Sequence, residues 1–191
     1  MLTEIQSYLQ QSPIVSSILT GIISSGVFLV VLSRLKPSLR ISTSICFDKE
    51  NNKYLFKIIN KSPFFKVFDI SVKLYSIEIV PTYNGENYKM EPVKLTLDHI
   101  KAIQRLNCSH YFQDYFCKDK RLETRTDYAA IFSTSVDLMP LLQQKSFIRF
   151  QVYAKHTLTG FGRIFNYDYK HSGNIVDGSF LSGNTFKIKS S

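Results

Sequence analysis

The chain has 191 residues, of which 44% are hydrophobic, and a formal net charge of +9. The length suits one ordinary domain with enough residues to bury a core, and the absence of internal repeats and low-complexity segments excludes a repeat array. Only Glu4 and Arg34 carry charged side chains within residues 1–35, so the positive charge belongs to residues 36–191. A basic domain favours anionic partners, but the scattered bases do not indicate a DNA-binding groove.

The first predicted element is a membrane-spanning helix. Ile14 to Leu32 form an apolar run of 19 residues inside a charge-free stretch from Ile5 to Ser33, and about 20 such residues cross a bilayer as a helix. A cleaved signal peptide would need a basic N-terminal region, a shorter apolar core and a small-residue cleavage site. We therefore predict an N-terminal tail and transmembrane helix at residues 1–36 and a domain at residues 37–191.

The charges that flank this helix predict its orientation. Arg34, Lys36 and Arg40 follow the helix, whereas the first 13 residues contain no Lys or Arg. Because short basic flanks stay on the cytosolic side, we expect the N-terminus outside and the domain in the cytosol, beside the anionic inner leaflet. The three cysteines agree with a reducing compartment, since an odd number needs no disulfide partner.

Small residues line one side of the helix. Ser17, Gly21 and Ser25 recur every four residues and so lie on one face. In lipid, this spacing lets two helix backbones approach closely. We expect this face to be a helix–helix interface that makes the chain a homo-oligomer. The alternative is that small residues are simply common in membrane helices.

The domain begins with alternating apolar and polar residues, the pattern of half-buried strands. Runs at residues 40–48 and 53–60 flank a polar turn and predict a hairpin. Strands are also predicted at 67–80 and 93–97, with a polar loop at 81–92 that contains the turn pair Asn84-Gly85. The residues expected to face the core are Ile41, Thr43, Ile45, Phe47, Tyr54, Phe56, Ile58, Phe68, Ile70, Val72 and Leu74, while Lys53 and Lys57 are expected on the outside.

The middle of the domain is less regular. Residues 98–106 carry apolar side chains at helical spacing, which predicts one or two helical turns. Residues 107–120 mix aromatic and charged side chains, as a packed loop does. A strand is predicted at 126–136, followed by a connector at 137–142 in which Pro140 limits any helix.

The C-terminal part predicts a second hairpin. Residues 146–155 and 161–169 alternate on either side of a turn, with Phe150 set against Tyr167 and Val152 against Phe165 on the apolar face. The same register sets Arg149 opposite Asp168 on the other face. A last strand is expected at 185–189.

This sequence of elements predicts a mainly β domain of seven to nine strands. Polar residues facing out and apolar residues facing in are typical of an antiparallel sandwich. The rhythm of the first half resembles immunoglobulin-like sandwiches, although the chain has no Trp and so lacks their Cys…Trp…Cys core. The predicted fold is a single N-terminal transmembrane helix followed by an antiparallel immunoglobulin-like β-sandwich.

A metal site is the first chemical possibility. Its ligands would be His99, Cys108, His110 and Cys117, which lie within 19 residues. Their spacing matches no common zinc scheme, so we predict reduced structural cysteines and no metal.

Catalytic pairs are the second possibility. His156 has Thr157 and Thr159 close by at one predicted turn, and His171 neighbours Ser172 at another. Neither pair lies in a nucleophile elbow or near a glycine-rich phosphate loop. Glu86 and Glu91 share a polar loop, where carboxylates are ordinarily solvated. We therefore expect no enzyme activity and no cofactor.

Aromatic residues interleaved with Lys and Arg can stack bases and neutralise phosphates. The chain has 11 Tyr and 15 Phe, several of them beside bases in the C-terminal hairpin. Because Phe165 and Tyr167 are expected in the core, the candidate ligand-binding residues are Arg149, Tyr153 and Arg163. The alternative explanation is ordinary packing, since aromatic residues favour strands.

Together these features favour a single-pass, membrane-anchored, non-catalytic binding module, which holds an unknown protein partner at the cytosolic face of an anionic bilayer. The alternative is a bacterial antiviral-type membrane effector, whose sandwich senses an anionic, cyclic nucleotide and whose helices oligomerise to perturb the membrane. That alternative rests on an analogy of architecture.

Overall fold

The computed structural model describes residues 13–62, 65–105, 128–142 and 146–190. The chain divides into two compact units, residues 1–36 and 37–191, and each is described by itself. The described part of the first unit is one helix, α2 (Pro13–Arg34). Proline suits the first helical position because the N–H it lacks would have no partner there.

The helix has the length and composition needed to cross a membrane. Its candidate span, Pro13–Leu32, contains 20 residues, none of them buried. At 1.5 Å per residue, the 22 residues of α2 extend about 33 Å, against about 30 Å for the bilayer hydrocarbon. The predicted apolar helix is confirmed, whereas its orientation stays a prediction.

The first sheet of the domain is built around β3 (Lys53–Asn60). It also contains β1 (Leu39–Ile41), β2 (Ile45–Asp48), β7 (Ala129–Thr134) and β10 (Ile175–Asp177). β1 and β2 pair antiparallel with opposite ends of β3, β7 pairs antiparallel with β3, and β10 pairs parallel with β2. The predicted hairpin is therefore confirmed, but its first strand is interrupted between Ile41 and Ile45. Thr43 lies in that interruption and is exposed, so its predicted place in the core is wrong.

The second sheet is antiparallel throughout and has the order β5-β4-β8-β9, with β6 also paired to β4. Its strands are β4 (Val67–Thr82), β5 (Gly85–Val93), β6 (His99–Ile103), β8 (Ser146–His156) and β9 (Gly162–Tyr169). The predicted register of the C-terminal hairpin is confirmed: Phe150 pairs with Tyr167, Val152 with Phe165 and Arg149 with Asp168.

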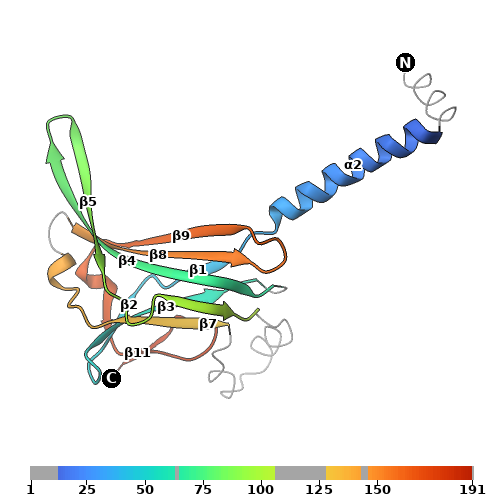
Figure 1. Ribbon diagram of the computed structural model, residues 1–191. Helices are drawn as coiled ribbons and strands as arrows, with labels where there is room; N and C mark the ends of the chain where they lie inside the picture. Colours follow the sequence, from blue (N-terminus) through green and yellow to red (C-terminus); the bar gives the residue numbers. More distant parts are fainter. Residues whose placement is uncertain (1–12, 63–64, 106–127, 143–145, 191) are drawn as a thin grey trace. The chain divides into compact units, whose positions relative to one another are not determined.

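The two sheets form separate layers that share one hydrophobic core (Figure 1). Phe56 of β3 stacks on Phe150 of β8, with ring centroids 4.8 Å apart and planes 4° from parallel. The ring of Tyr169 meets Phe56 edge-on, and its hydroxyl donates a 2.7 Å hydrogen bond to the Ser42 carbonyl. A buried Tyr needs both apolar packing and a polar partner. Tyr169 of the second sheet finds the packing on Phe56 of the first sheet and the partner at Ser42, so these contacts join the two layers.

Three expectations for the middle of the chain are wrong. Residues 81–92 do not form a loop: β4 continues to Thr82, the chain turns at residues 83–84, and β5 returns from Gly85. Residues 94–97 are not strand, because β5 ends at Val93. The helical turns predicted at 98–106 are replaced by β6, which pairs with the start of β4. The predicted loop at 107–120 lies outside the described residues.

A β-bulge near Asp69 alters which residues face the core. The register between β4 and β8 shifts between Phe68 and Ser71, and Asp69 has a φ of 51°. The bulge turns Val67 and Ile70 inward, where both are fully buried, and leaves Phe68 only half-buried. The predicted core position of Phe68 is therefore wrong, whereas those of Ile70, Val72 and Leu74 are confirmed.

The C-terminal segment covers the outer side of the first sheet. It contains β11 (Ser179–Phe180) and β12 (Ile188–Lys189), which form a small antiparallel pair. Lys57 points from β3 into this cover and is only 1% exposed; its ammonium donates a hydrogen bond to the Leu181 carbonyl. The sequence predicted Lys57 on the outer side of its sheet, which is correct. The C-terminal segment nevertheless buries it there. Two short 3-10 helices, Pro140–Leu142 and Ser172–Asn174, complete the connections.

Candidate binding surface

The outer face of the second sheet, the side away from the core, is open. Along β8 the buried residues alternate with partly exposed ones, which places the latter on this face. Three neighbouring strands thus contribute a band of mostly polar side chains: Lys73, Tyr75, Arg149, Gln151, Tyr153, Asn166 and Asp168. The candidate ligand residues Arg149 and Tyr153 both belong to this band.

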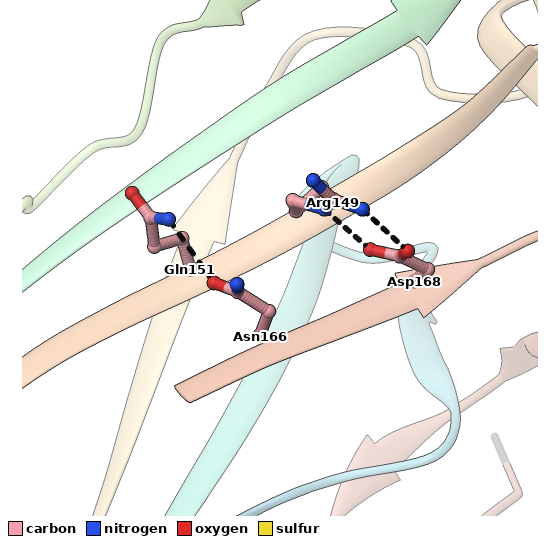
Figure 2. A network of polar contacts seen from close by, with 4 residues as sticks. All are labelled: Arg149, Gln151, Asn166 and Asp168. Atoms are coloured by element: carbon pink, nitrogen blue, oxygen red, sulfur yellow. Dashed lines mark hydrogen bonds and ion pairs between the residues drawn. The ribbon is translucent and has the colours of Figure 1, made fainter. Parts of the chain in front are cut away.

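Arg149 and Asp168 form a two-bond ion pair in the band (Figure 2). The Arg149 Nε and Nη2 atoms donate to the two Asp168 carboxylate oxygens at 2.7 and 2.8 Å. The next rung has the Gln151 amide donating to the Asn166 amide oxygen at 3.1 Å. The Asp168 hydrogen bond raises the pKa of Arg149. Both side chains are less than one-third exposed, so the pair is better shielded from water than an ordinary surface salt bridge.

A pocket of about 350 Å³ lies beside this ion pair. Its wall combines aromatic rings with cations, and its lining residues are Ile79, Tyr88, Ser146, Phe147, Arg149, Asp168 and Lys170. The Arg149 guanidinium sits 5.6 Å from the centre of the Phe147 ring, and Tyr88 meets the same ring edge-on. The volume is at the lower end of the range for small-molecule sites. Asp168 neutralises Arg149, which leaves Lys170 as the cation available to a ligand.

The β4–β5 hairpin extends past the rest of its sheet. Glu78 is the last β4 residue paired with β8, and we call residues 79–90 beyond it the arm; Figure 1 shows it projecting as a two-stranded ribbon. Ile79 pairs with Tyr88 and Ile77 with Met90, so these side chains share one face. Tyr88 and Met90 are 60% and 46% exposed. The arm therefore carries an apolar face that runs into the pocket at its base.

The other face of the arm is polar. Glu78 pairs across the ribbon with Lys89, and Ser76 with Glu91; the Lys89 ammonium lies 2.8 Å from a Glu91 carboxylate oxygen. Glu86 lies on the apolar side, opposite Pro81, so Glu86 and Glu91 are on different faces and cannot act on one substrate atom together. Our sequence reasoning missed the arm. Alternation on both sides of Asn84-Gly85 was the signal that could have revealed it.

The structure does not bring the three candidate ligand residues together. Tyr153 lies on the outer face, where its ring covers Gly162 so closely that a Cβ there would come within 2.4 Å of the hydroxyl. Arg163 pairs with the buried Ala154 and so lies on the other side of the sheet, with its guanidinium 5.0 Å from the centre of the Phe165 ring. Arg149 and Tyr153 share a face, and Arg163 does not.

Asp69 holds a second charged cluster near the start of β4. Its two carboxylate oxygens contact the Lys155 ammonium and the His99 Nε2 atom, the latter at 3.0 Å. The hydrogen bond from Lys155, and then that from His99, lowers the pKa of Asp69. His99 thus has a carboxylate partner, whereas Cys108, His110 and Cys117 lie outside the described residues. Within the described ranges, no group of three or more His, Cys, Asp or Glu residues could hold a metal.

The catalytic pairs considered from the sequence are engaged in turns. His156 is buried, its ring packs edge-on against Phe65, and burial lowers its pKa. The Thr157 hydroxyl donates to the Lys66 carbonyl, whereas the Thr159 hydroxyl lies 3.4 Å from the His156 Nδ1 atom at the limit of a hydrogen bond. At the other turn, the His171 amide donates to the Asn174 side chain. These contacts hold the turns in place.

Two hydroxyls in the first half of α2, including that of Ser17 on the small-residue face, bond carbonyls of their own helix. The Ser17 hydroxyl donates to the Pro13 carbonyl at 2.9 Å, and Thr20 donates to Ser16 at 2.8 Å. A Cβ added at Gly21 would meet nothing within 4 Å. Packing within the chain therefore does not explain a glycine at this position, where helix propensity alone favours Ala by about 1 kcal/mol.

Compared with known proteins, the chain matches no family model and no curated sequence.

Proposed function

We propose that the protein is a single-pass membrane-anchored, non-catalytic binding module whose partner docks on the arm. The observation that supports this is the apolar face of Ile79, Tyr88 and Met90, which continues into the pocket beside Arg149. A two-stranded ribbon gains little stability by itself, and exposed apolar side chains on it would cost solubility without a partner. A protein with an apolar ridge and an acidic group for Lys170 would complement both parts.

In this proposal the domain is an immunoglobulin-like sandwich. Two facing sheets with one aromatic core, and loops gathered at either end, support this assignment. The parallel pairing of β10 with β2 is compatible with it, because such folds vary at their edges. A rigid sandwich suits binding, since the partner meets a surface that is already ordered.

Site-specific photocrosslinking tests the docking face. A benzophenone amino acid at Tyr88 or Met90 in the full-length membrane-bound chain should trap a discrete partner. The same group at Asn87 or Glu91, on the polar face of the same strand, is the matched control and should trap far less. Equal adducts on both faces, or none on either, would contradict docking on the arm.

We propose that the N-terminus faces out and that the domain lies in the cytosol. Arg34, Lys36 and Arg40 follow the apolar span, whereas residues 1–13 contain no Lys or Arg. Reporters fused to the C-terminus should be active only if they work in the cytosol. Moving the basic flank to the N-terminal side should reverse the result.

We also propose that α2 self-associates through Ser17, Gly21 and Ser25. Because the Ser17 hydroxyl is already bonded within its own helix, close packing at Gly21 would supply the attraction. Gly21→Ile places a branched side chain in that contact and should abolish association in a membrane two-hybrid assay. Ile22→Leu, on a different face, should preserve it. Equal signals from the two variants would remove this face from the proposal.

A second candidate function is supported by the aromatic and cationic wall of the pocket. Tyr88 could stack a base while Lys170 neutralises a phosphate, as expected of a sensor for an anionic nucleotide. In that case the protein would be a bacterial antiviral-type effector whose helices perturb the membrane. Calorimetry of the full-length chain with a panel of cyclic oligonucleotides should then show binding that Lys170→Ala removes. Toxicity that disappears on deleting residues 1–36 would favour this effector.

A further inference from the structure

A continuous set of contacts organises the end of the domain that contains Ser38 and β1, where the chain enters from α2. Ser38 accepts a hydrogen bond from the Lys61 amide, and the Asn60 side chain bonds the Phe65 and Gln104 carbonyls. Further along, the Phe65 ring meets His156 at the close of β8. These contacts place β1, the start of β4, the end of β6 and the β8–β9 turn at one end of the sandwich, which we call the basic end.

Apolar side chains project from the basic end on an ordered turn. Leu158, Phe161 and Ile164 are 62%, 49% and 56% exposed. The turn is held by two backbone hydrogen bonds of 2.9 Å between its flanks, and Gly160 supplies the positive φ of 69° that it needs. Single exposed apolar residues are ordinary, but Leu158 and Phe161 share one fixed turn, and Ile164 follows two residues into β9, so the three form a surface patch.

Among the described residues, the charges around this patch are mostly positive. Five cations lie at the basic end: Arg40, Lys61, Lys66, Arg105 and Arg163. None of them has an ion-pair partner among the described residues, although the Lys61 ammonium is partly buried and donates a 2.9 Å hydrogen bond to the Asn184 side chain. Asp69 is the one described acid at this end, and it is already bound to Lys155 and His99.

The arm, by contrast, carries its exposed apolar residues among acids. Its two strands carry Glu78, Glu86 and Glu91 against Lys89, and Lys170 lies in the pocket at its base. An anionic membrane would therefore attract the basic end more strongly than the arm. Each Lys or Arg held near an anionic leaflet contributes roughly 1 kcal/mol, and inserted apolar side chains add to that attraction.

The chain itself brings the basic end to a bilayer. Only residues 35–38 separate Arg34 of α2 from Leu39 of β1. At no more than about 3.6 Å per residue, those five steps keep Leu39 within about 18 Å of Arg34, however the two units are oriented. Tethering of this kind makes even a weak surface contact effective, because the second binding event is intramolecular.

We propose that the basic end is a membrane-docking surface, in which Leu158 and Phe161 insert between anionic phospholipid headgroups while the surrounding Lys and Arg side chains bind phosphates. The proposal rests on the proposed membrane anchoring by α2 and extends it: the domain lies on the bilayer by one defined end. Docking there would direct the arm away from the lipid, because β4 runs from Val67 at the basic end to Thr82 in the arm, about 50 Å along the strand.

Tryptophan fluorescence tests this directly, because the chain contains no Trp. Phe161→Trp and Leu158→Trp place a single probe in the patch, and Tyr83→Trp places one at the fully exposed arm tip. Each full-length variant is incorporated into nanodiscs of phosphatidylcholine and phosphatidylserine, with and without bromine on the upper acyl chains. The patch probes should shift to shorter wavelength and lose emission in brominated discs, and the arm probe should do neither.

The role of charge is tested in the Phe161→Trp background. Lys66→Glu together with Arg163→Glu should restore the emission, as should discs of phosphatidylcholine alone, while the chain still co-elutes with the discs. Co-elution with an unquenched patch probe in anionic discs would overturn the docking surface and leave the anchoring helix standing. A chain that does not enter the discs at all would overturn both. Two patch positions guard against a local packing defect at either one.

Discussion

Each sheet of the domain carries a basic side chain on its outer face, but one of the two is covered and the other is open. Lys57 of β3 and Arg149 of β8 both alternate with core residues, and both neighbour an aromatic ring. The C-terminal segment covers Lys57, whose ammonium bonds only a carbonyl among the contacts described, and burial lowers its pKa to about 8. Arg149 lies on an open face, where Asp168 pairs with it and raises its pKa.

The position of a residue in the strand pattern therefore does not determine its electrostatic environment. The open face keeps its charge by supplying a carboxylate in the neighbouring strand. The covered face supplies none, so the protonated Lys57 is destabilising and its deprotonation is favoured. A basic residue that is covered without a counter-charge thus makes the unfolding free energy depend on pH near neutrality. An open, paired arginine does not.

The largest expected effect comes from uncovering the first sheet. Gly178 precedes β11 with a φ of 132°, and a Cβ there would come within 2.2 Å of the Lys189 carbonyl oxygen. Gly178→Ala should therefore detach β11 from β12 and cost about 3 kcal/mol of unfolding free energy. Denaturant titration measures the loss, and faster amine labelling of Lys57 reports the opening. Gly173→Ala, where a Cβ meets nothing within 4 Å, should change neither.

On the open face, removing Arg149 should cost less. Arg149→Met leaves the half-buried Asp168 carboxylate without its partner and should lower the unfolding free energy by about 2 kcal/mol. Gln151→Ala, one rung along the same ladder, should cost under about 0.5 kcal/mol because its bond is exposed. In a double-mutant cycle with Asp168→Asn, the double variant should lose less unfolding free energy than the sum of the two single variants, because both remove the same ion pair. Additive losses would show that the pair does not act as one unit.

The pH response of the covered face should be smaller still. Lys57 has a pKa of about 8 when folded and about 10.5 when unfolded, so the unfolded chain binds more protons between these values and stability rises with pH there. From pH 7 to 9 the gain should be about 1 kcal/mol. Above pH 9 the gain is opposed, because burial raises the pKa of Cys46 from 9.0 to about 12.

Lys57→Met should flatten this slope between pH 7 and 9, as read from denaturant midpoints at each pH. Lys73→Met, on the exposed outer face of the other sheet, is the matched control and should leave the slope in place. A slope that survives Lys57→Met would assign the response to another group.

The smallest effect is expected for a pair that is exposed on both sides. The Lys49 ammonium lies 2.6 Å from Asp177 of β10, but both side chains are more than half exposed. Solvent screening limits such pairs, so Lys49→Ala should change the unfolding free energy by no more than about 0.5 kcal/mol. A loss as large as that of Arg149→Met would mean that exposure does not separate the two kinds of pair.

Alternating apolar and polar residues correctly predicted the strands that have one side in the core and the other side outside it. β3, β8 and β9 have one side in the core and one outside, and the pairing of Arg149 with Asp168 followed from their register. The arm was missed because solvent surrounds it, so polar residues occur on both of its faces. The sequence around Lys57 does not predict its burial, because the residues that cover it come more than 120 positions later.

The failed helix prediction at 98–106 has a more specific cause. Ile100 and Ile103 are three residues apart, as on a helix, but they pair with Ile70 and Val67, which are also three apart and both buried. The distorted backbone at Asp69 lets residues at that spacing face the same way within a strand. Of the candidate ligand residues, Arg149 lies on the outer face, as its predicted register required, and Tyr153 shares that face. Arg163 lies on the other side because it continues the inward series of Phe165.

The length of β4 has a consequence for how this protein can vary. Its 16 residues belong to the core at one end and to the arm at the other. Within the core, adding or removing one residue would exchange the two faces of the strand. Beyond Glu78, residues can be gained or lost two at a time on each side of the Tyr83-Asn84 turn, in steps of roughly 7 Å, with no change to the buried register. Among divergent descendants of this chain, arm length should differ freely while the spacing from Ile70 to Leu74 stays fixed.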